Sequence, residues 1–321
     1  MKDPQRRARY QQFVEAAQAP LFLNAWWLDI MAGAGLWDAA FAEKGASLTG
    51  VMPYVKHKKG RFTFLGHPPL TPYLGPWLYY PPGQKLSSRY SYHAKIVAML
   101  TENLPRYHKA LFSASPLWED GLPLIWNGFS LAPRYTFILN PPQPTGNDAP
   151  EELLFSAYEG AIRRQINKAR KALTIEQADT PDVLFHLLQH TFKRKQKALP
   201  VSEKKLHQLW RALRARDSGY LIQARHETHG VVAAMLIVTD NHYHYYLLGG
   251  NHTQWLHLGG ASFLMHHAIT TACRKGLPFN FEGSMYPDIA RFFRSFGAEA
   301  RPYIQYRRVN ALLLKLVNCI K

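Results

Sequence analysis

A change in hydrophobic period at Gly219 constrains the fold of this 321-residue chain more than any other feature. Before it, apolar residues recur at helical spacing; after it, short apolar runs are separated by glycine-rich and polar turns. This second pattern is typical of an α/β unit in which a helix begins beside the end of a strand. The predicted elements are strands at 220–225, 230–238 and 242–248, a helix at 262–275, a strand at 279–282, a helix from Pro287, a strand at 303–309 and a tail helix.

The segment LLGGNHTQWLHLGGAS connects the third of these strands to the following helix. Glycines at 259 and 260 let a phosphate approach the backbone closely. The first N–H groups of the helix and its dipole bind anions without a cationic side chain. The spacing therefore favours a pyrophosphate site. The alternative is a tight turn without a ligand, because Gly-Gly often precedes a helix.

A polar segment at 140–150, NPPQPTGNDAP, indicates a linker, because Pro, Gly, Asn and Asp all oppose regular structure there. We therefore divide the chain into a first domain at 1–145 and a second domain at 146–321. Chains of this length commonly form about two domains with cores of their own.

Three helices are predicted between the linker and Gly219. Ser156 and Glu159 have the spacing of a capping box, which predicts that a helix begins there. Further helices are expected at 181–197 and 203–216, the latter capped by Ser202. The apolar positions of the first helix are Ile162, Ile166, Ala169 and Leu173.

The first domain begins with two helix candidates and continues as an antiparallel meander. The run HPPLTPYLGPWLYYPPG contains six prolines between Pro68 and Pro82, and proline lacks an N–H donor, so we expect loop and sheet edge here. Tyr73 and Trp77 are candidate substrate-binding residues that would form an aromatic wall for an acceptor. The alternative is a surface loop ordered by its prolines. The helices are expected at 5–17 and 21–31, and the strands at 48–55, 61–65 and 77–80.

The net charge of +17 is concentrated in residues 1–10, 161–217 and 291–321. The middle patch alone contains 14 basic and 5 acidic residues. Such patches predict an anionic partner, which includes nucleic acid, a phosphorylated cofactor, an anionic lipid surface or a nucleotide-linked substrate. The alternative is that they are solvated helix faces.

The sequence predicts a cytoplasmic protein without an integral membrane segment. Its longest apolar run, 231–238, is far shorter than the roughly 20 residues that a membrane-spanning helix needs. The basic N-terminus leads into no apolar signal-peptide core. Cys273 and Cys319 provide neither a disulfide framework nor the spacing of a zinc site, which fits a reducing compartment.

Eight of the fifteen histidines fall between His226 and His267, but their spacing predicts no metal site. Adjacent histidines cannot share a helix face, and the segment has few carboxylates to complete a ligand set. His244 or His242 is a candidate general base, because an imidazole titrates near neutral pH. The alternative is that both line a half-buried sheet.

The run FEGSMYPDIARFFRSFG gathers the other candidates. Glu282, at the end of a predicted strand, is a candidate catalytic base or acceptor anchor, with a capping or salt-bridging role as the alternative. Tyr286 and Arg291 are candidate substrate-binding residues, and Arg294 is a candidate catalytic residue. No nucleophile elbow, phosphate loop or dinucleotide fingerprint is present, so hydrolase and ATPase functions lack support.

The runs FNFEGS and IARFFRSFGAE, preceded by YYLLGGN and the glycine-rich turn, resemble the closing half of a GNAT-type acyltransferase domain. More narrowly, they are similar to the Fem family of peptidoglycan aminoacyltransferases and to related Fem-like acetyltransferase domains. The basic helix RRQINKARKAL at 163–173 also resembles a helix of that family. The resemblance is specific over 155–309 and weaker over 20–140.

The resemblance implies an α/β (α+β) fold of tandem GNAT-like domains, each a mixed, mostly antiparallel sheet flanked by helices. It implies an acyl donor between splayed strands and an amine acceptor in the cleft between the domains. By position, the pyrophosphate of acetyl-CoA or another acyl-CoA would be held by Gly259, Gly260, Ala261 and Ser262. Fem ligases use a charged tRNA instead, which the basic patch at 161–217 would serve. An acyl carrier protein is a third donor that the same patch would suit.

Phe293 departs from the family pattern. Many coenzyme A users have a tyrosine acid at this position and some Fem ligases a lysine, whereas phenylalanine donates no proton. Arg294, another group or solvent would then act on the leaving group, or catalysis has been lost. We predict an N-acyltransferase that transfers an acyl or aminoacyl group to an amine of a cell-envelope precursor, polysaccharide or small molecule. The alternative is a non-catalytic GNAT-fold protein that binds RNA or an anionic surface.

Overall fold

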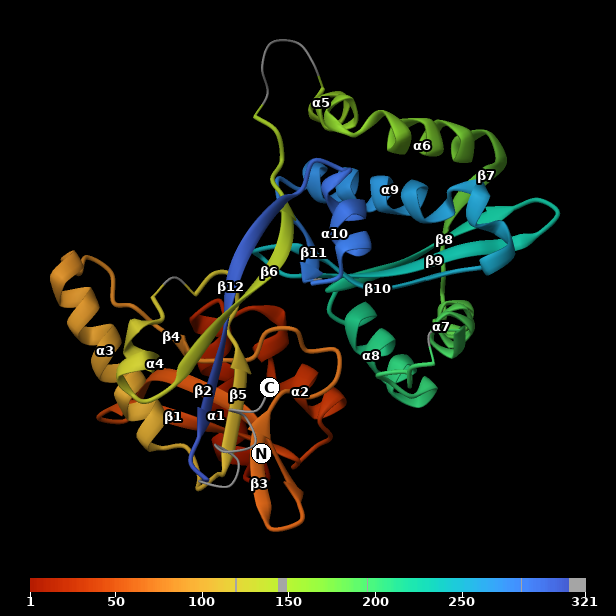
Figure 1. Cartoon of the computed structure of the whole chain (residues 1–321). Helices are drawn as coiled ribbons and strands as arrows, with labels where there is room; N and C mark the ends of the chain where they lie inside the picture. Colours follow the sequence, from red (N-terminus) through yellow and green to blue (C-terminus); the bar gives the residue numbers. More distant parts are fainter. Residues whose placement is uncertain (119, 144–148, 195, 284, 312–321) are drawn as a thin grey trace. The chain divides into compact units, whose positions relative to one another are not determined.

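The chain forms two compact units (Figure 1). Unit 1 comprises Met1–Arg134 and Pro302–Lys321, and unit 2 comprises Tyr135–Arg301. No helix among the described residues has the length and apolar character needed to cross a membrane. The computed structural model describes residues 1–118, 120–143, 149–194, 196–283 and 285–311.

Unit 1 is built on an antiparallel meander, β1 to β3, with β5 parallel to β3 and β12 antiparallel to β5. Its core lies between this sheet and α3, where Phe112 and Tyr306 are fully buried. Its elements are α1 (Pro4–Ala16), η1 (Leu21–Leu23), α2 (Ala25–Met31), β1 (Trp37–Lys44), β2 (Ser47–Lys59), β3 (Phe62–Gly66), β4 (Trp77–Leu78), α3 (Leu86–Glu102), β5 (Lys109–Ser113), α4 (Leu122–Trp126), the start of β6 (Ser130–Leu139) and most of β12 (Glu299–Val309).

Unit 2 repeats this plan. Strands β7 to β10 are antiparallel, β11 runs parallel to β10, and β6 pairs antiparallel with β11. In Figure 1, α6 and α9 cover one face of this sheet, and α7 and α8 lie on the other. Its further elements are α5 (Pro150–Ala157), α6 (Gly160–Ala172), β7 (Leu173–Gln177), α7 (Asp182–Arg194), α8 (Glu203–Arg214), β8 (Gly219–His226), β9 (Gly230–Thr239), β10 (His244–Asn251), η2 (Thr253–Leu258), α9 (Gly260–Arg274), β11 (Phe279–Gly283) and α10 (Pro287–Arg294).

The shared plan confirms the expected tandem GNAT-like fold. In each unit an antiparallel meander is followed by a long helix, α3 or α9, and then by a strand parallel to the last strand of the meander. A parallel strand requires a crossover connection, and the helix provides it. Each sheet is therefore mixed and mostly antiparallel, as the resemblance implied.

Two strands depart from a simple division of the chain. The strand at the end of the described chain, β12, pairs with β5 of unit 1, and residues 136–139 of β6 pair with β11 of unit 2. A division at residue 145 would assign 302–309 to the second domain instead. The hydrophobic pattern of a strand marks which side chains are buried but does not identify its pairing partner.

The predicted capping box is wrong. Ser156 lies inside α5, where its hydroxyl donates to the carbonyl of Leu153. Helix α6 begins at Gly160, and the Glu159 side chain makes no capping hydrogen bond. The Ser202 cap is confirmed, since its hydroxyl accepts from the N–H of Lys205. The linker residues 144–148 and the predicted tail helix at 312–321 lie outside the described residues.

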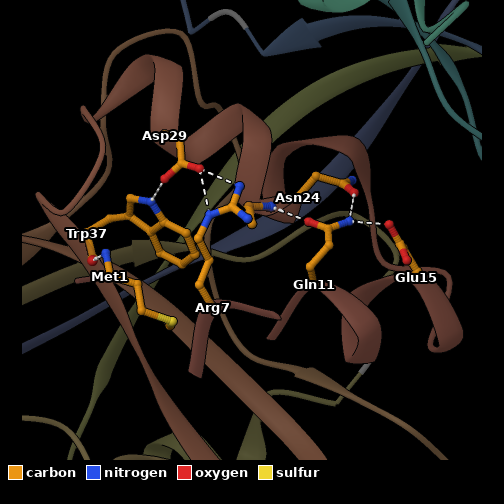
Figure 2. Close-up of polar contacts among 8 residues, drawn as sticks. Met1, Arg7, Gln11, Glu15, Asn24, Asp29 and Trp37 are labelled. Atoms are coloured by element: carbon orange, nitrogen blue, oxygen red, sulfur yellow. Dashed lines mark hydrogen bonds and ion pairs between the residues drawn. The ribbon is translucent and has the colours of Figure 1, made fainter. Parts of the chain in front are cut away.

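Polar contacts at the N-terminus hold α1 and α2 against β1 (Figure 2). Asp29 on α2 accepts from the indole N–H of Trp37 at 2.7 Å and from Nε of Arg7 at 2.8 Å. Nearby, Arg6 and Arg9 pair with Asp38 and Glu43. Three of the four basic residues in the first predicted patch are therefore neutralised within unit 1. This part of the charge pattern has a structural explanation that needs no anionic partner.

We expect Asp29→Ala to lower the free energy of unfolding by about 2 kcal/mol, because it leaves a half-buried guanidinium and an indole N–H without their acceptor. Asp38→Ala is the matched control, since it removes a more exposed ion pair that contributes less than about 1 kcal/mol. Urea denaturation of both variants measures the difference. Equal losses of stability would contradict a special role for Asp29.

Candidate functional site

Strands β10 and β11 separate after a short parallel pairing. Their register joins His244 to Phe279 and Tyr245 to Asn280, and no further pair follows between them in the described residues. A bulge in β10 at residue 247 also interrupts its register with β9. Beyond Tyr245, no strand of the described chain pairs with the edge of β10 that faced β11. An extended ligand with amide groups can bind such an edge as an additional strand would.

The glycine-rich turn follows β10 and η2, where α9 begins. Gly259 has a left-handed φ of +74°, and a Cβ there would lie 3.1 Å from the carbonyl oxygen of Gln165. A Cβ on Gly260 would lie 3.0 Å from Cβ of Ala233. Both positions therefore need glycine for close packing. The first N–H groups of α9 lack acceptors within the helix, so the turn offers donors that suit a phosphate.

The four predicted residues of this turn, 259–262, differ in their exposure to solvent. Gly260 and Ser262 are buried, and the Ser262 hydroxyl donates to Oε1 of Gln165 on α6 at 2.9 Å. Gly259 and Ala261 are partly exposed. A ligand at this turn would contact backbone N–H groups, while the Ser262 side chain holds α6 and α9 together.

Glu282 occupies a strained position at the end of β11. Its φ is +61°, in the left-handed region, and the register of β11 with β6 shifts between Asn280 and Gly283. Oδ1 of Asn280 stabilises this bulge by accepting from the Glu282 N–H at 2.9 Å and from the Thr136 hydroxyl at 2.7 Å. A glutamate in this conformation costs about 1–3 kcal/mol, and such strain clusters at functional sites.

The Glu282 carboxyl group is also electrostatically unusual. Its Oε1 is buried and has no hydrogen-bond partner among the described residues. Burial raises the pKa of this carboxyl well above its ordinary value, because the charged form loses solvation. Strain and a raised pKa together mark Glu282 as the strongest candidate acid or base of the predicted set.

His244 is a core residue. Its ring is fully buried under α9, with Nδ1 3.3 Å from the Tyr220 hydroxyl, and that hydroxyl also reaches the carbonyl of Ala268. Burial, with a smaller contribution from Lys275, lowers the pKa of His244 to about 4. The imidazole is therefore neutral and enclosed. His242 lies in the β9–β10 turn, where its N–H donates to Asp240.

A second buried histidine links α9 to α6. Nε2 of His266 accepts from Arg170 at 2.7 Å, and Nδ1 lies 3.4 Å from the Tyr158 hydroxyl. Burial and the charge of Arg170 lower the pKa of His266 to about 4. An imidazole that accepts from arginine must be neutral at that nitrogen. Protonation would therefore break the link between the two helices.

These two histidines make stability depend on pH in a defined direction. Between about pH 6.5 and 4 the unfolded chain binds their protons and the folded chain does not, so stability falls as pH falls through this range. We expect the urea midpoint at pH 4.5 to lie clearly below that at pH 6.5. His266→Gln should show a shallower dependence. An equal slope for variant and wild type would contradict this assignment.

The predicted residues on α10 differ in their exposure to solvent. Phe293 is buried and packs against Phe281 and Phe137, with ring centroids 4.9 and 5.7 Å apart. Arg291 and Arg294 are exposed, and the Arg294 guanidinium lies 5.7 Å from the centre of the Phe137 ring. Phe293 is therefore a packing residue. The two arginines are accessible to a ligand.

Tyr286 is also accessible. It is 61% exposed, and its hydroxyl and ring contact the Lys197 ammonium at 3.3 and 5.0 Å. This contact joins the segment before α10 to the segment between α7 and α8. A cation beside an exposed phenol suits an anionic or polar ligand.

In unit 1 the two residues of the predicted aromatic wall, Tyr73 and Trp77, also differ in their surroundings. Tyr73 is fully buried against Phe22 and Tyr303. Trp77 lines a cavity of about 470 Å³, and its indole N–H donates to the carbonyl of Ala17. The cavity is otherwise lined largely by aromatic and polar side chains, among them Tyr79, Tyr80, Arg89, Tyr90, His93, Trp118 and Asp120.

Two further features of unit 2 have no recognisable motif in the sequence. Asp182 on α7 and Glu203 and His207 on α8 bring one ligand atom each within 4.8 Å of one another, at exposed or half-exposed positions. Tyr246, at the point where β10 leaves β11, packs against Phe293. The adjacent aromatics in HYHYYLLGG were the only signal for Tyr246, and they do not distinguish it from its neighbours.

Comparison with known proteins agrees with this geometry. Residues 157–282 match the family model described as an acetyltransferase (GNAT) domain. FemX has a similar structure over 97% of this chain and 98% of its own, with 12% identity and a TM-score of 0.67. The search of curated proteins returns no match for this chain.

Two further solved structures are similar. The C-terminal domain of a proposed lysylphosphatidylglycerol synthetase from Agrobacterium fabrum covers 98% of this chain and 95% of its own, with 12% identity and a TM-score of 0.58. An acetyltransferase of the GNAT family from Colwellia psychrerythraea covers 94% and 97%, with 14% identity and a TM-score of 0.50. The expected resemblance to Fem-like GNAT proteins is thus confirmed in fold and in the matched domain.

Proposed function

We propose that this protein, which has a GNAT acetyltransferase domain within a Fem-like fold, is an N-acyltransferase that passes an acyl or aminoacyl group to an amine. One observation carries the proposal. Strands β10 and β11 separate after Tyr245, and β10 leads through η2 to the glycine turn that begins α9, an arrangement that lies within the matched residues 157–282. It offers backbone amides to an extended donor and helix N–H groups to its phosphates.

The donor that best fits this opening is acetyl-CoA or another acyl-CoA. Its pyrophosphate would bind at the N–H groups of Gly260, Ala261 and Ser262, close to the Gly259 turn. When bound, it would supply an activated thioester. On the adjacent α6, Arg163, Arg164 and Lys171 have no carboxylate partner among the described residues, so their charge is available to an anionic donor. The same charge would suit an aminoacyl-tRNA or an acyl carrier protein.

The proposed chemical role of Glu282 is to accept the proton of the acceptor amine. The nitrogen attacks the acyl carbon, the C–N bond forms, and the bond to the leaving atom breaks. Glu282 then removes the proton that the new amide nitrogen must lose. A carboxylate whose pKa is raised by burial is a stronger base than an exposed one, which suits this step.

For the acceptor, we propose contacts with Tyr286, Arg291 and Arg294 of unit 2. The Trp77 cavity, which lies within unit 1, is a second candidate site considered by itself. Its aromatic lining suits a sugar or another flat group, and Arg89 and Asp120 add polar contacts. One similar structure is the C-terminal domain of a proposed lysylphosphatidylglycerol synthetase, a name that joins lysine to a phospholipid. That name supports an acceptor among cell-envelope precursors, with polysaccharides and small amines as further members of the class.

Isothermal titration tests the donor. We expect saturable, micromolar binding of acetyl-CoA, with coenzyme A and bulk tRNA as parallel titrants. Tight, salt-sensitive binding of tRNA without coenzyme A binding would instead favour aminoacyl-tRNA as donor or the RNA-binding alternative, which turnover with charged tRNA separates. Binding of none of the three would contradict the proposed function.

A further inference from the structure

A phenol that the proposed proton transfer to Glu282 does not use lies where β10 separates from β11. Tyr246 is the first residue of β10 beyond its pairing with β11. Its ring packs edge-to-face against Phe293 of α10, with centroids 6.3 Å apart and planes at 80°. Phe293 in turn contacts Phe281 of β11. The three rings, from β10, β11 and α10, therefore pack together beside the point where the two strands separate.

The phenol group of Tyr246 lies over Gly249, three residues further along β10. A Cβ on Gly249 would lie 2.2 Å from the Tyr246 oxygen, so the hydroxyl fills the space that the missing side chain leaves. Within the described part of the chain, this hydroxyl makes no hydrogen bond to another residue, although the hydroxyl of the adjacent Tyr245 donates to Asp240 at 3.0 Å. Tyr246 thus presents an available O–H donor on the strand that would hold the donor's acyl group.

We propose that Tyr246 donates the proton to the leaving atom of the acyl donor, in place of the acid that Phe293 cannot supply. This inference rests on the proposed acyltransferase function. As the amine nitrogen bonds to the acyl carbon, the carbon–sulfur bond of a thioester, or the carbon–oxygen bond of an ester, breaks. Its electron pair moves to the leaving atom, which takes the Tyr246 proton and departs as a thiol or alcohol. The tyrosinate regains a proton from solvent, which balances the one lost by the attacking amine.

Burial raises the pKa of the Tyr246 phenol to about 12, so the group is protonated at neutral pH. A donor of this kind acts most strongly when negative charge develops on the leaving atom, because its hydrogen bond is stronger to an anion than to a neutral acceptor. Its effect therefore falls on the chemical step more than on donor binding.

The test compares Tyr246→Phe with Tyr245→Phe, which removes a hydroxyl from the neighbouring residue of the same strand. With acetyl-CoA as donor and glucosamine or lysine as acceptor, the release of free thiol is measured. With charged tRNA as the second donor, the release of uncharged tRNA is measured. For Tyr246→Phe we expect kcat to fall about 100-fold or more, with KM within threefold of wild type. Tyr245→Phe should stay within about twofold. Circular dichroism of both variants confirms that they fold.

A second thioester, S-(4-nitrophenyl) thioacetate, distinguishes proton donation by Tyr246 from a packing role of its ring. Its thiolate leaves without a proton, so the loss of kcat in Tyr246→Phe should shrink to less than about tenfold with this donor. An equal loss with both thioesters, or no loss with acetyl-CoA, would overturn the assignment of Tyr246 while leaving the proposed function intact. A wild-type protein that transfers no acyl group from any donor would overturn both.

Discussion

Replacing Glu282 by glycine should stabilise the fold by about 1 kcal/mol while abolishing acyl transfer. Glycine adopts a φ of +61° without steric cost, and the change removes a buried carboxyl oxygen that has no partner among the described residues. A gain in stability combined with a loss of activity is the signature of a residue kept in place for function. Urea denaturation and an acyl-transfer assay on the same preparation measure both effects.

Two variants control this experiment. Asp217, exposed at the end of α8, has a comparable φ of +49°, so Asp217→Gly should give a similar gain in stability without affecting activity. Glu282→Gln keeps the size and the backbone strain but cannot accept the amine proton, and its kcat should fall about 100-fold or more. Full activity in Glu282→Gln would contradict the proposed base.

The second large effect is expected at the beginning of α9. Ala261→Asp places a negative charge among the first N–H groups of the helix, where the helix dipole stabilises an aspartate. The same charge would repel a pyrophosphate at this turn, so binding of acetyl-CoA should weaken at least about tenfold without loss of stability. Isothermal titration and thermal unfolding provide the two measurements.

Ala261→Asn is the matched control, because asparagine has the shape of aspartate without its negative charge. It should reduce acetyl-CoA affinity only a few-fold. Equal effects of the two substitutions would mean that steric blocking, and not charge, explains the loss. Unchanged affinity in Ala261→Asp would show that the phosphates bind elsewhere.

The Gly259 turn could be predicted from the sequence because its signal is local. A strand, a glycine pair and a helix are adjacent in the chain, and the structure places α9 directly after the turn. The roles of individual side chains in the turn were less visible. Ser262 bonds to Gln165, nearly a hundred residues earlier in the chain, and only the packing of α6 against α9 brings them together.

His244 shows why candidate bases are harder to predict. Because an imidazole ordinarily titrates near neutral pH, His244 was a candidate. In the structure, α9 covers the face of β10 on which His244 lies. The alternation of side chains along a strand does not predict which face a helix will cover. Glu282 was found through its place at a strand end. Its strained backbone depends on the bulge between β11 and β6, whose pairing joins residues about 140 positions apart.

The basic patches illustrate the same limit of local information. Arg7 and Arg163 contribute equally to the charge count, yet Arg7 is paired with Asp29, 22 residues away. Arg163, on α6, has no carboxylate partner among the described residues. Charge density in the sequence therefore identified both patches, and only the tertiary structure separates the neutralised patch from the available one.

Detection of an N-acylated product by mass spectrometry tests the central claim most directly. The full chain is incubated with acetyl-CoA, or with charged tRNA, and with glucosamine, lysine or an amine-bearing envelope precursor. We expect one donor to give an amide product with a matching yield of free thiol or uncharged tRNA, and Glu282→Gln to give almost none. The absence of product from both donors, with tight and salt-sensitive RNA binding, would contradict the account and favour a non-catalytic protein of the same fold.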